Sequence, residues 1–175
     1  MAKNTSGRGR RDLTVKVKTA RGRKLSSTRW LQRQLNDPYV RRAQAEGYRS
    51  RAAYKLLDLQ KQHRILKSGQ RVVDLGCWPG GFLQVATEIV GPRGVSVGVD
   101  RVAIDPPFKN ANVIVMKADL EDPTVGGLVL EALRGKPAHV VLCDAAPKLT
   151  GVRDVDRAAE ERLLQAVEAL LPGLL

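Results

Sequence analysis

The chain has 175 residues, 43% of them hydrophobic, which is enough for one globular domain with a sizeable core and too few for two ordinary domains. No run of about 18 apolar residues is present, so the sequence predicts no transmembrane helix. The basic N-terminus is not followed by an apolar stretch and therefore does not resemble a signal peptide.

The cysteines and histidines exclude two further classes of site. Cys77 and Cys143 have no CxxC partner, and we expect them to be reduced thiols in a cytoplasmic protein. His63 and His139 are far apart in the sequence, with no metal-ligand spacing around either. The sequence therefore predicts no metal site.

Charge is distributed unevenly along the chain, whose formal net charge is +12. Residues 1–71 hold 20 Lys/Arg against 4 Asp/Glu, whereas residues 72–175 hold 10 against 14. A basic segment joined to a near-neutral domain indicates a polyanionic partner, nucleic acid before membrane. Residues 1–25 are too poor in apolar residues to fold and are expected to form a disordered tail, either merely solvated or also binding phosphates.

The first predicted elements are helical. Hydroxyl residues at 26–28 precede Trp30, Leu31 and Leu35 at helical spacing, and a turn at 36–38 precedes a short helix from about residue 39 to 46. Ser50 is then expected to cap another helix. One face of that helix carries Ala53, Leu56, Leu57 and Gln60.

From residue 72 onward, strands alternate with helices. Apolar runs predict strands at 72–75, 95–99, 113–116 and 140–142, and periodic segments predict helices at 81–90, 124–134 and 154–171, the last closed by Pro172-Gly173. This alternation is typical of an α/β fold: a doubly wound, mostly parallel sheet with helices on both faces.

An aspartate stands at or just past the end of each predicted strand: Asp74, Asp100, Asp119 and Asp144. Ligands of open α/β sheets bind outside the carboxyl ends of the strands. Four carboxylates gathered there would repel one another without a polar or cationic group between them. We therefore expect a binding site at this edge.

The loop after the first strand narrows the class of ligand. Residues 73–82 read V-D-L-G-C-W-P-G-G-F, which lacks both the G-x-G-x-x-G spacing and the lysine of a P-loop. Gly80-Gly81 at a helix start would let a ligand approach the backbone, and Asp100 stands where an acid accepts a ribose diol. Asp119 is placed to meet an adenine amino group. These features favour S-adenosylmethionine as the ligand, and a dinucleotide is the alternative ligand.

Further motifs make the resemblance specific. The loop is followed by G-V-D and by C-D-A-A-P-K-L-T-G, and it is preceded by S-S-T-R-W-L (26–31) and R-S-R-A-A-Y-K-L (49–56). Together these motifs resemble the FtsJ/RlmE family of ribosomal RNA 2′-O-methyltransferases. The resemblance covers residues 26–173 and implies a Rossmann-like methyltransferase domain at 26–175. It also implies methylation of a uridine ribose in large-subunit (23S) rRNA, with S-adenosylmethionine as cofactor. A monomer is expected, although the sequence does not decide the oligomeric state.

The resemblance also implies the site residues. Gly80, Phe82 (usually a tryptophan), Asp100, Asp119 and Asp144 would line the cofactor site. The family's catalytic tetrad is Lys-Asp-Lys-Glu, and its first two members fall on Lys55 and Asp144. In the family a lysine of lowered pKa deprotonates the 2′-hydroxyl. Asp144 would hold that lysine and Lys55 would help orient the hydroxyl.

This sequence departs from the family after L-L-P-G, where a fifth strand bearing the second lysine is expected. That lysine and the tetrad's glutamate have no counterpart, and Lys148 belongs to a loop that the family does not use for catalysis. We therefore expect a fragment or frameshifted product with an open strand edge at 140–143, low stability and little activity. Two alternatives remain: a non-catalytic RNA-binding module, and a tRNA 2′-O-methyltransferase.

Overall fold

The computed structural model describes residues 17, 22, 28, 32 and 35–175. The predicted disordered tail at 1–25 and the helix predicted from residue 26 thus lie, apart from isolated positions, outside the described residues. Both stay predictions.

The described elements follow the predicted order closely. The helices are α2 (Pro38–Ala45), α3 (Ala52–His63), α4 (Gly81–Val90), α5 (Val125–Ala132) and α6 (Arg153–Leu174). The strands are β1 (Arg71–Leu75), β2 (Val95–Asp100), β3 (Val113–Lys117) and β4 (Val140–Cys143). None of these helices is long and apolar enough to cross a membrane.

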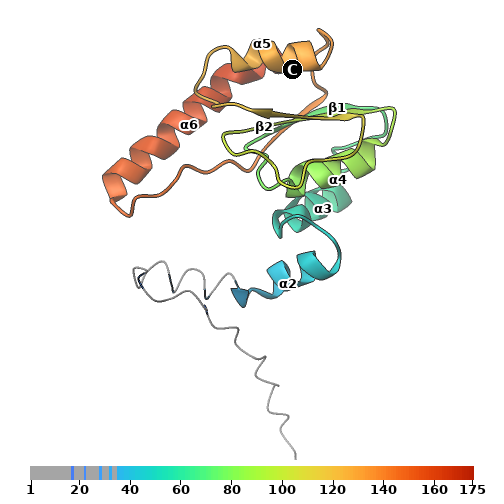
Figure 1. Ribbon diagram of the computed structural model, residues 1–175. Coiled ribbons are helices and arrows are strands. Elements are labelled where there is room, and N and C mark those ends of the chain that lie inside the picture. Colours follow the sequence, from blue (N-terminus) through green and yellow to red (C-terminus); the bar gives the residue numbers. More distant parts are fainter. Residues whose placement is uncertain (1–16, 18–21, 23–27, 29–31, 33–34) are drawn as a thin grey trace, which may run out of the picture.

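The strands form one parallel sheet in the order β3-β2-β1-β4. Figure 1 shows α5 and α6 on one face of this sheet and α3 and α4 on the other. The predicted α/β class, with helices on both faces of a parallel sheet, is therefore confirmed. Among the described strands β4 has a neighbour on one side only, as the sequence predicted for residues 140–143.

The two faces of the sheet pack into separate cores because side chains alternate along each strand. Val73 and Leu75 of β1 pack with α5 and the end of α6. Val72 packs with α3 and α4, in a cluster that includes Leu56 and Phe82. By the same alternation Asp74 faces the α3/α4 side, which decides its environment below.

The predicted serine cap of α3 is wrong. Arg51 occupies the N-cap position and makes no side-chain cap, and the Ser50 hydroxyl is buried without a hydrogen-bond partner among the described residues. The reason is the close approach of α4: a Cβ built on Gly81 would lie 2.1 Å from Ser50 Oγ. Ser50 therefore packs against α4 and does not cap α3.

The predicted end of the last helix is also wrong, because Pro172 lies inside α6 and the helix continues to Leu174. Proline removes one backbone donor, which opposes a helix interior. Tertiary contacts offset this cost, since Leu174 is fully buried and its carbonyl accepts a hydrogen bond from Ala138 N at 2.6 Å. Packing of the last turn thus outweighs the local signal to stop.

Candidate active site

Four aspartates lie at the carboxyl edge of the sheet. Asp74 is in β1 and Asp100 ends β2, while Asp119 follows β3 by two residues and Asp144 follows β4 directly. Because all the strand pairs are parallel, these ends share one edge. Their environments nevertheless differ, and the differences separate their roles.

Lys55 and Asp144 meet at this edge although 89 positions separate them in the sequence. Lys55 Nζ donates to Asp144 Oδ1 at 2.8 Å and to Oδ2 at 3.0 Å. The first group comes from α3 and the second from the end of β4, so the packing of α3 beside the sheet creates the pair. The lysine side chain is 61% exposed, which leaves its ammonium group accessible to a ligand.

Asp100 organises the loop that follows β1. Its Oδ2 accepts from Trp78 N at 2.9 Å, and its Oδ1 accepts from Val102 N at 2.8 Å. Each carboxylate oxygen still has a lone pair free, because an ionised carboxylate offers about four acceptor positions. Asp100 can therefore hold its loop and accept further hydrogen bonds from a diol.

Asp119 lies more openly at the same edge. Its Oδ1 accepts from Glu121 N at 3.1 Å, and its Oδ2 lies 3.4 Å from Arg101 Nε. The side chain is 44% exposed, so this ion pair contributes little to stability. A ligand donor that reached Asp119 would compete only with a weak, solvated contact.

Asp74 is buried to 1% exposure, and neither of its oxygens has a hydrogen-bond partner among the described residues. Burial, with further repulsion from Asp144 and Asp100, raises the pKa of Asp74 to about 7, although the nearby backbone of Leu83 offsets part of this effect. An unsatisfied buried carboxyl is costly. Asp74 stands in β1 just before the glycine loop, so its enclosed carboxyl differs from the other three aspartates of this edge.

Two glycines of the loop are required by geometry. Gly76 has a φ of +79°, and a Cβ there would lie 2.4 Å from Ala145 Cβ and 2.7 Å from Ala145 Cα. Gly80 has a φ of +107°, and a Cβ there would lie 2.8 Å from Arg49 Cδ. The loop is thus both a turn out of β1 and a tightly packed wall of the site.

Phe82 lies away from the open part of the site. Its side chain is 8% exposed and belongs to the core between α3, α4 and the sheet, with Leu142 in the same cluster. The structure thus brings Lys55, Asp100, Asp119 and Asp144 to one edge of the sheet. It places Gly80 against Arg49 and Phe108, and Phe82 in the core on the α3/α4 side.

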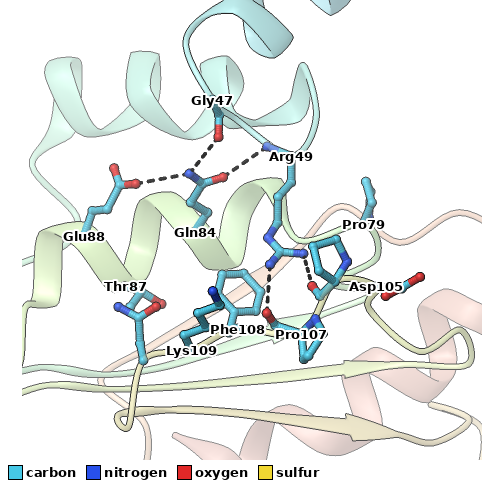
Figure 2. A pocket seen from close by; sticks show the side chains of 12 residues that line it. Gly47, Arg49, Pro79, Gln84, Thr87, Glu88, Asp105, Pro107, Phe108 and Lys109 are labelled. Carbon is cyan, nitrogen blue, oxygen red and sulfur yellow. Dashed lines mark hydrogen bonds between the residues drawn. The ribbon is translucent and has the colours of Figure 1, made fainter.

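Arg49, to which the sequence analysis gave no role, joins the glycine loop to the connection between β2 and β3. Its Nη1 donates to Pro106 O at 2.6 Å, and its guanidinium carbon lies 4.1 Å from the ring centre of Phe108. A cavity of about 640 Å³ opens beside these contacts, shown in Figure 2. The only sequence signal for Arg49 was its place at the start of R-S-R-A-A-Y-K-L.

Comparison with known proteins decides the family. The profile of the family described as FtsJ-like methyltransferase matches residues 48–175, which include the glycine loop, Lys55 and all four aspartates. The chain belongs to this family. It is thus a member of a methyltransferase family, as the motifs predicted.

Relatives of this FtsJ-like chain agree with the assignment. It is 51% identical to a ribosomal RNA large subunit methyltransferase E of Ruegeria pomeroyi, over 97% of this chain and 75% of that one. It is also 51% identical to the protein of the same name from a second Ruegeria strain, over 88% of this chain and 66% of that one. The FtsJ-like chain therefore spans two thirds to three quarters of the length of these relatives.

A solved structure supports the fold. The crystal structure of a putative ribosomal RNA methyltransferase from Plasmodium falciparum superposes with a TM-score of 0.62 at 27% identity, over 73% of this chain and 72% of that one. The predicted Rossmann-like methyltransferase fold is thus confirmed for the FtsJ-like chain. No group of three or more potential metal ligands occurs in the described part of the chain.

Proposed function

We propose that this FtsJ-like chain transfers a methyl group from S-adenosylmethionine to the ribose 2′-hydroxyl of a uridine in 23S rRNA. The observation that carries the proposal is the Lys55–Asp144 pair, with Nζ–Oδ distances of 2.8 and 3.0 Å at the carboxyl edge of the sheet. The relatives named ribosomal RNA large subunit methyltransferase E support the choice of substrate.

The residues at the edge suit this cofactor. Asp100 would accept hydrogen bonds from the ribose diol and Asp119 from the adenine amino group. The loop that carries Gly80 is held to Asp100 through Trp78 N and would form the wall beside them. Phe82 would support the loop from behind rather than contact the ligand.

The chemistry requires an oxygen aligned with an electrophilic carbon. The cofactor supplies a methyl group on a sulfonium. Lys55 would donate a hydrogen bond to the ribose oxygen and so fix its direction, and Asp144 would hold Lys55 in place through the bidentate contact. Both act by position and charge.

Removal of the proton from the 2′-hydroxyl is assigned by the family resemblance to a second lysine. That lysine has no match among these 175 residues. Where such a base is present, general base catalysis commonly contributes about 10²–10⁴-fold to the rate.

The test is methyl transfer with excess protein, so that a single turnover is detectable. Methyl-labelled S-adenosylmethionine is incubated with the 175-residue chain and large ribosomal subunits that lack the modification. A 2′-O-methyl group blocks alkaline cleavage at its own phosphodiester bond, so we expect label in an alkali-stable uridine dinucleotide of 23S rRNA. Label in a base, in tRNA or in protein contradicts the proposal.

Matched variants assign the role of the pair. We expect Lys55→Met to lower the transfer rate by about 10²-fold because the ribose oxygen loses its alignment, with cofactor affinity measured by calorimetry unchanged. The control Lys61→Met removes an exposed lysine of the same helix and should leave the rate unchanged. Equal rates for the two variants would remove Lys55 from the mechanism. RNA binding without cofactor binding would favour the non-catalytic alternative, to which the basic residues 1–71 point.

A further inference from the structure

A second concave surface lies at the opposite edge of the sheet, at the amino ends of the strands. A groove of about 460 Å³ is bordered by the starts of β1, β2 and β3 and by the segment after α5. Its lining includes Arg71, Arg93, Asn112, Arg134 and Lys136. The proposed function uses none of these residues.

The charge of this groove is of one sign. Four of its lining residues are Lys or Arg, and none of the described residues that line it is acidic. Residues 72–175 as a whole carry more acids than bases, 14 against 10. Three of those ten bases, Arg93, Arg134 and Lys136, nevertheless gather here. The domain is thus polarised, with carboxylates at one edge of the sheet and cations at the other.

Most of these cations have no side-chain partner among the residues that the structure describes. Arg93, Arg134 and Lys136 are exposed, and their side chains make no hydrogen bond or ion pair with another residue that the structure describes. Arg71 is held, since its Nε donates to Pro137 O at 2.6 Å. Unpaired like charges that share a groove repel one another, and an anion between them would relieve that repulsion.

The backbone around the groove is fixed. Asn112 Nδ2 donates to Gly91 O at 2.9 Å and to Gly94 O at 3.2 Å, which ties the turn bearing Arg93 to the start of β3. Arg134 has a φ of +59°, in the left-handed region that non-glycine residues seldom adopt. The cations therefore project from positions set by the fold.

Helix dipoles explain part of this pattern. Arg93 and Arg134 follow the ends of α4 and α5, where a cation is favoured. Arg64 follows the end of α3 in the same way, with a φ of +50°, but does not line the groove. Dipoles account for one cation after each helix. They do not account for Arg71, which begins β1, or for Lys136, which lies between α5 and β4. These two residues complete the groove.

We propose that this groove binds the sugar–phosphate backbone of RNA, at a segment distinct from the one that reaches Lys55. Because a strand of five residues is about 16 Å long, one nucleotide cannot occupy both edges of the sheet. The proposal rests on the proposed function for the identity of the nucleic acid, a folded ribosomal RNA that can present two segments. None of the described lining residues is aromatic, so the groove offers no surface for stacking bases and contacts the backbone without reading sequence.

The test measures binding of a 20-base-pair RNA duplex to the full chain as a function of salt. In Arg93→Glu/Arg134→Glu we expect affinity at least 5-fold lower and a slope of log K against log salt smaller by about 1–2, since each neutralised phosphate contributes slightly less than one. The control Arg64→Glu also reverses the charge of an arginine that follows a helix and has a positive φ. It should keep the wild-type slope.

A local readout separates the groove from the basic N-terminal region. Acetylation of lysines, read by mass spectrometry, should show the duplex protecting Lys136 but not Lys61, which lies on α3. Equal loss of affinity in the Arg64→Glu control, or no protection of Lys136, overturns the proposal. If the double variant does not fold, Arg93→Gln/Lys136→Gln replaces it with the same expectations.

Two further outcomes are informative. Inorganic phosphate alone could stabilise the wild type against heat but not the double variant, while both proteins bind the duplex with equal affinity. That result would make the groove a small-anion site, and the proposal would be wrong. Duplex binding requires no methyl transfer. Failure of the labelling experiment therefore leaves this test intact, and failure here leaves cofactor binding and the Lys55 variant unaffected.

Discussion

A single buried carboxyl shows how the site departs from an ordinary core. Asp74 occupies a strand position whose neighbours Val73 and Leu75 are fully buried, and its side chain is enclosed with no hydrogen-bond partner in the part of the chain that the structure describes. A soluble domain that had only to fold would place an apolar residue there, because an unpaired buried carboxyl is destabilising. Its place just before the glycine loop fits a role in the site.

The titration of Asp74 predicts a dependence of stability on pH. Its pKa rises from 3.8 in the unfolded chain to about 7 in the folded one, so the folded state binds more protons between these values. Stability should therefore fall as pH rises from about 4 to 8. Asp74→Asn removes this titration and should be more stable than the wild type at pH 8 by up to about 4 kcal/mol, with a far smaller difference at pH 4.5.

Urea unfolding of both proteins at the two pH values measures this difference. Asp58→Asn, at an exposed aspartate of α3, is the control and should show no comparable change with pH. A stability difference between Asp74→Asn and the wild type that is the same at pH 4.5 and 8 would show that Asp74 remains ionised throughout.

At the scale of elements, the site depends on how α3 meets the sheet. The helix carries Lys55 to Asp144 at the end of β4, and the segment before it places Arg49 against the β2–β3 connection. The same segment packs on the start of α4 through Ser50 and Gly81. The helix α3 and the segment before it thus connect the proposed catalytic pair to the glycine loop of the proposed cofactor site.

Arg49 should therefore matter to cofactor affinity through the loop that it holds. Arg49→Lys keeps the charge but loses the planar guanidinium that reaches Pro106 O and Pro107 O and lies over Phe108. We expect cofactor affinity to fall about 5–10-fold, equivalent to roughly 1 kcal/mol, together with faster amide exchange at residues 105–110.

Arg51→Lys is the matched control for this prediction, because Arg51 belongs to the same motif but pairs with Asp37 on the surface. It should leave both cofactor affinity and amide exchange at 105–110 unchanged. Normal exchange in Arg49→Lys would mean that the guanidinium does not hold the loop.

At the scale of the whole molecule, charge is the dominant feature. Residues 1–35 contain 11 of the 30 Lys/Arg and one acid, a net +10 of the total +12. Long-range attraction to a polyanion therefore depends mostly on this segment, whereas the groove at the amino edge adds a local contact.

Deletion of residues 1–35 should lower the affinity for an RNA duplex by at least 10-fold at about 0.1 M salt and flatten its salt dependence. Fluorescence anisotropy across a salt series measures both quantities. A chain of residues 1–175 in which six of the lysines and arginines before residue 36 are changed to glutamine is the control, and should behave like the deletion. If this chain binds like the wild type, charge is not the cause.

Much of the fold could be predicted from local sequence. Valine-rich runs gave the four strands to within about a residue of their observed bounds, because a buried parallel strand must be apolar along its length. The helix at 81–90 was predicted at its observed bounds from its apolar periodicity. The aspartates at the strand ends were visible for the same reason, since a break in an apolar run shows where a strand leaves the core.

The sequence by itself therefore determined the class of fold, the edge of the sheet that holds the aspartates, and the uneven charge. Only the tertiary structure decided which side chains meet. It brought Lys55 to Asp144 across 89 positions, turned Asp74 into the core, held Pro172 within a helix and gathered four cations into a groove. The physical reason is that periodicity reports a residue's own burial, whereas partners are chosen by the packing of segments distant in the chain.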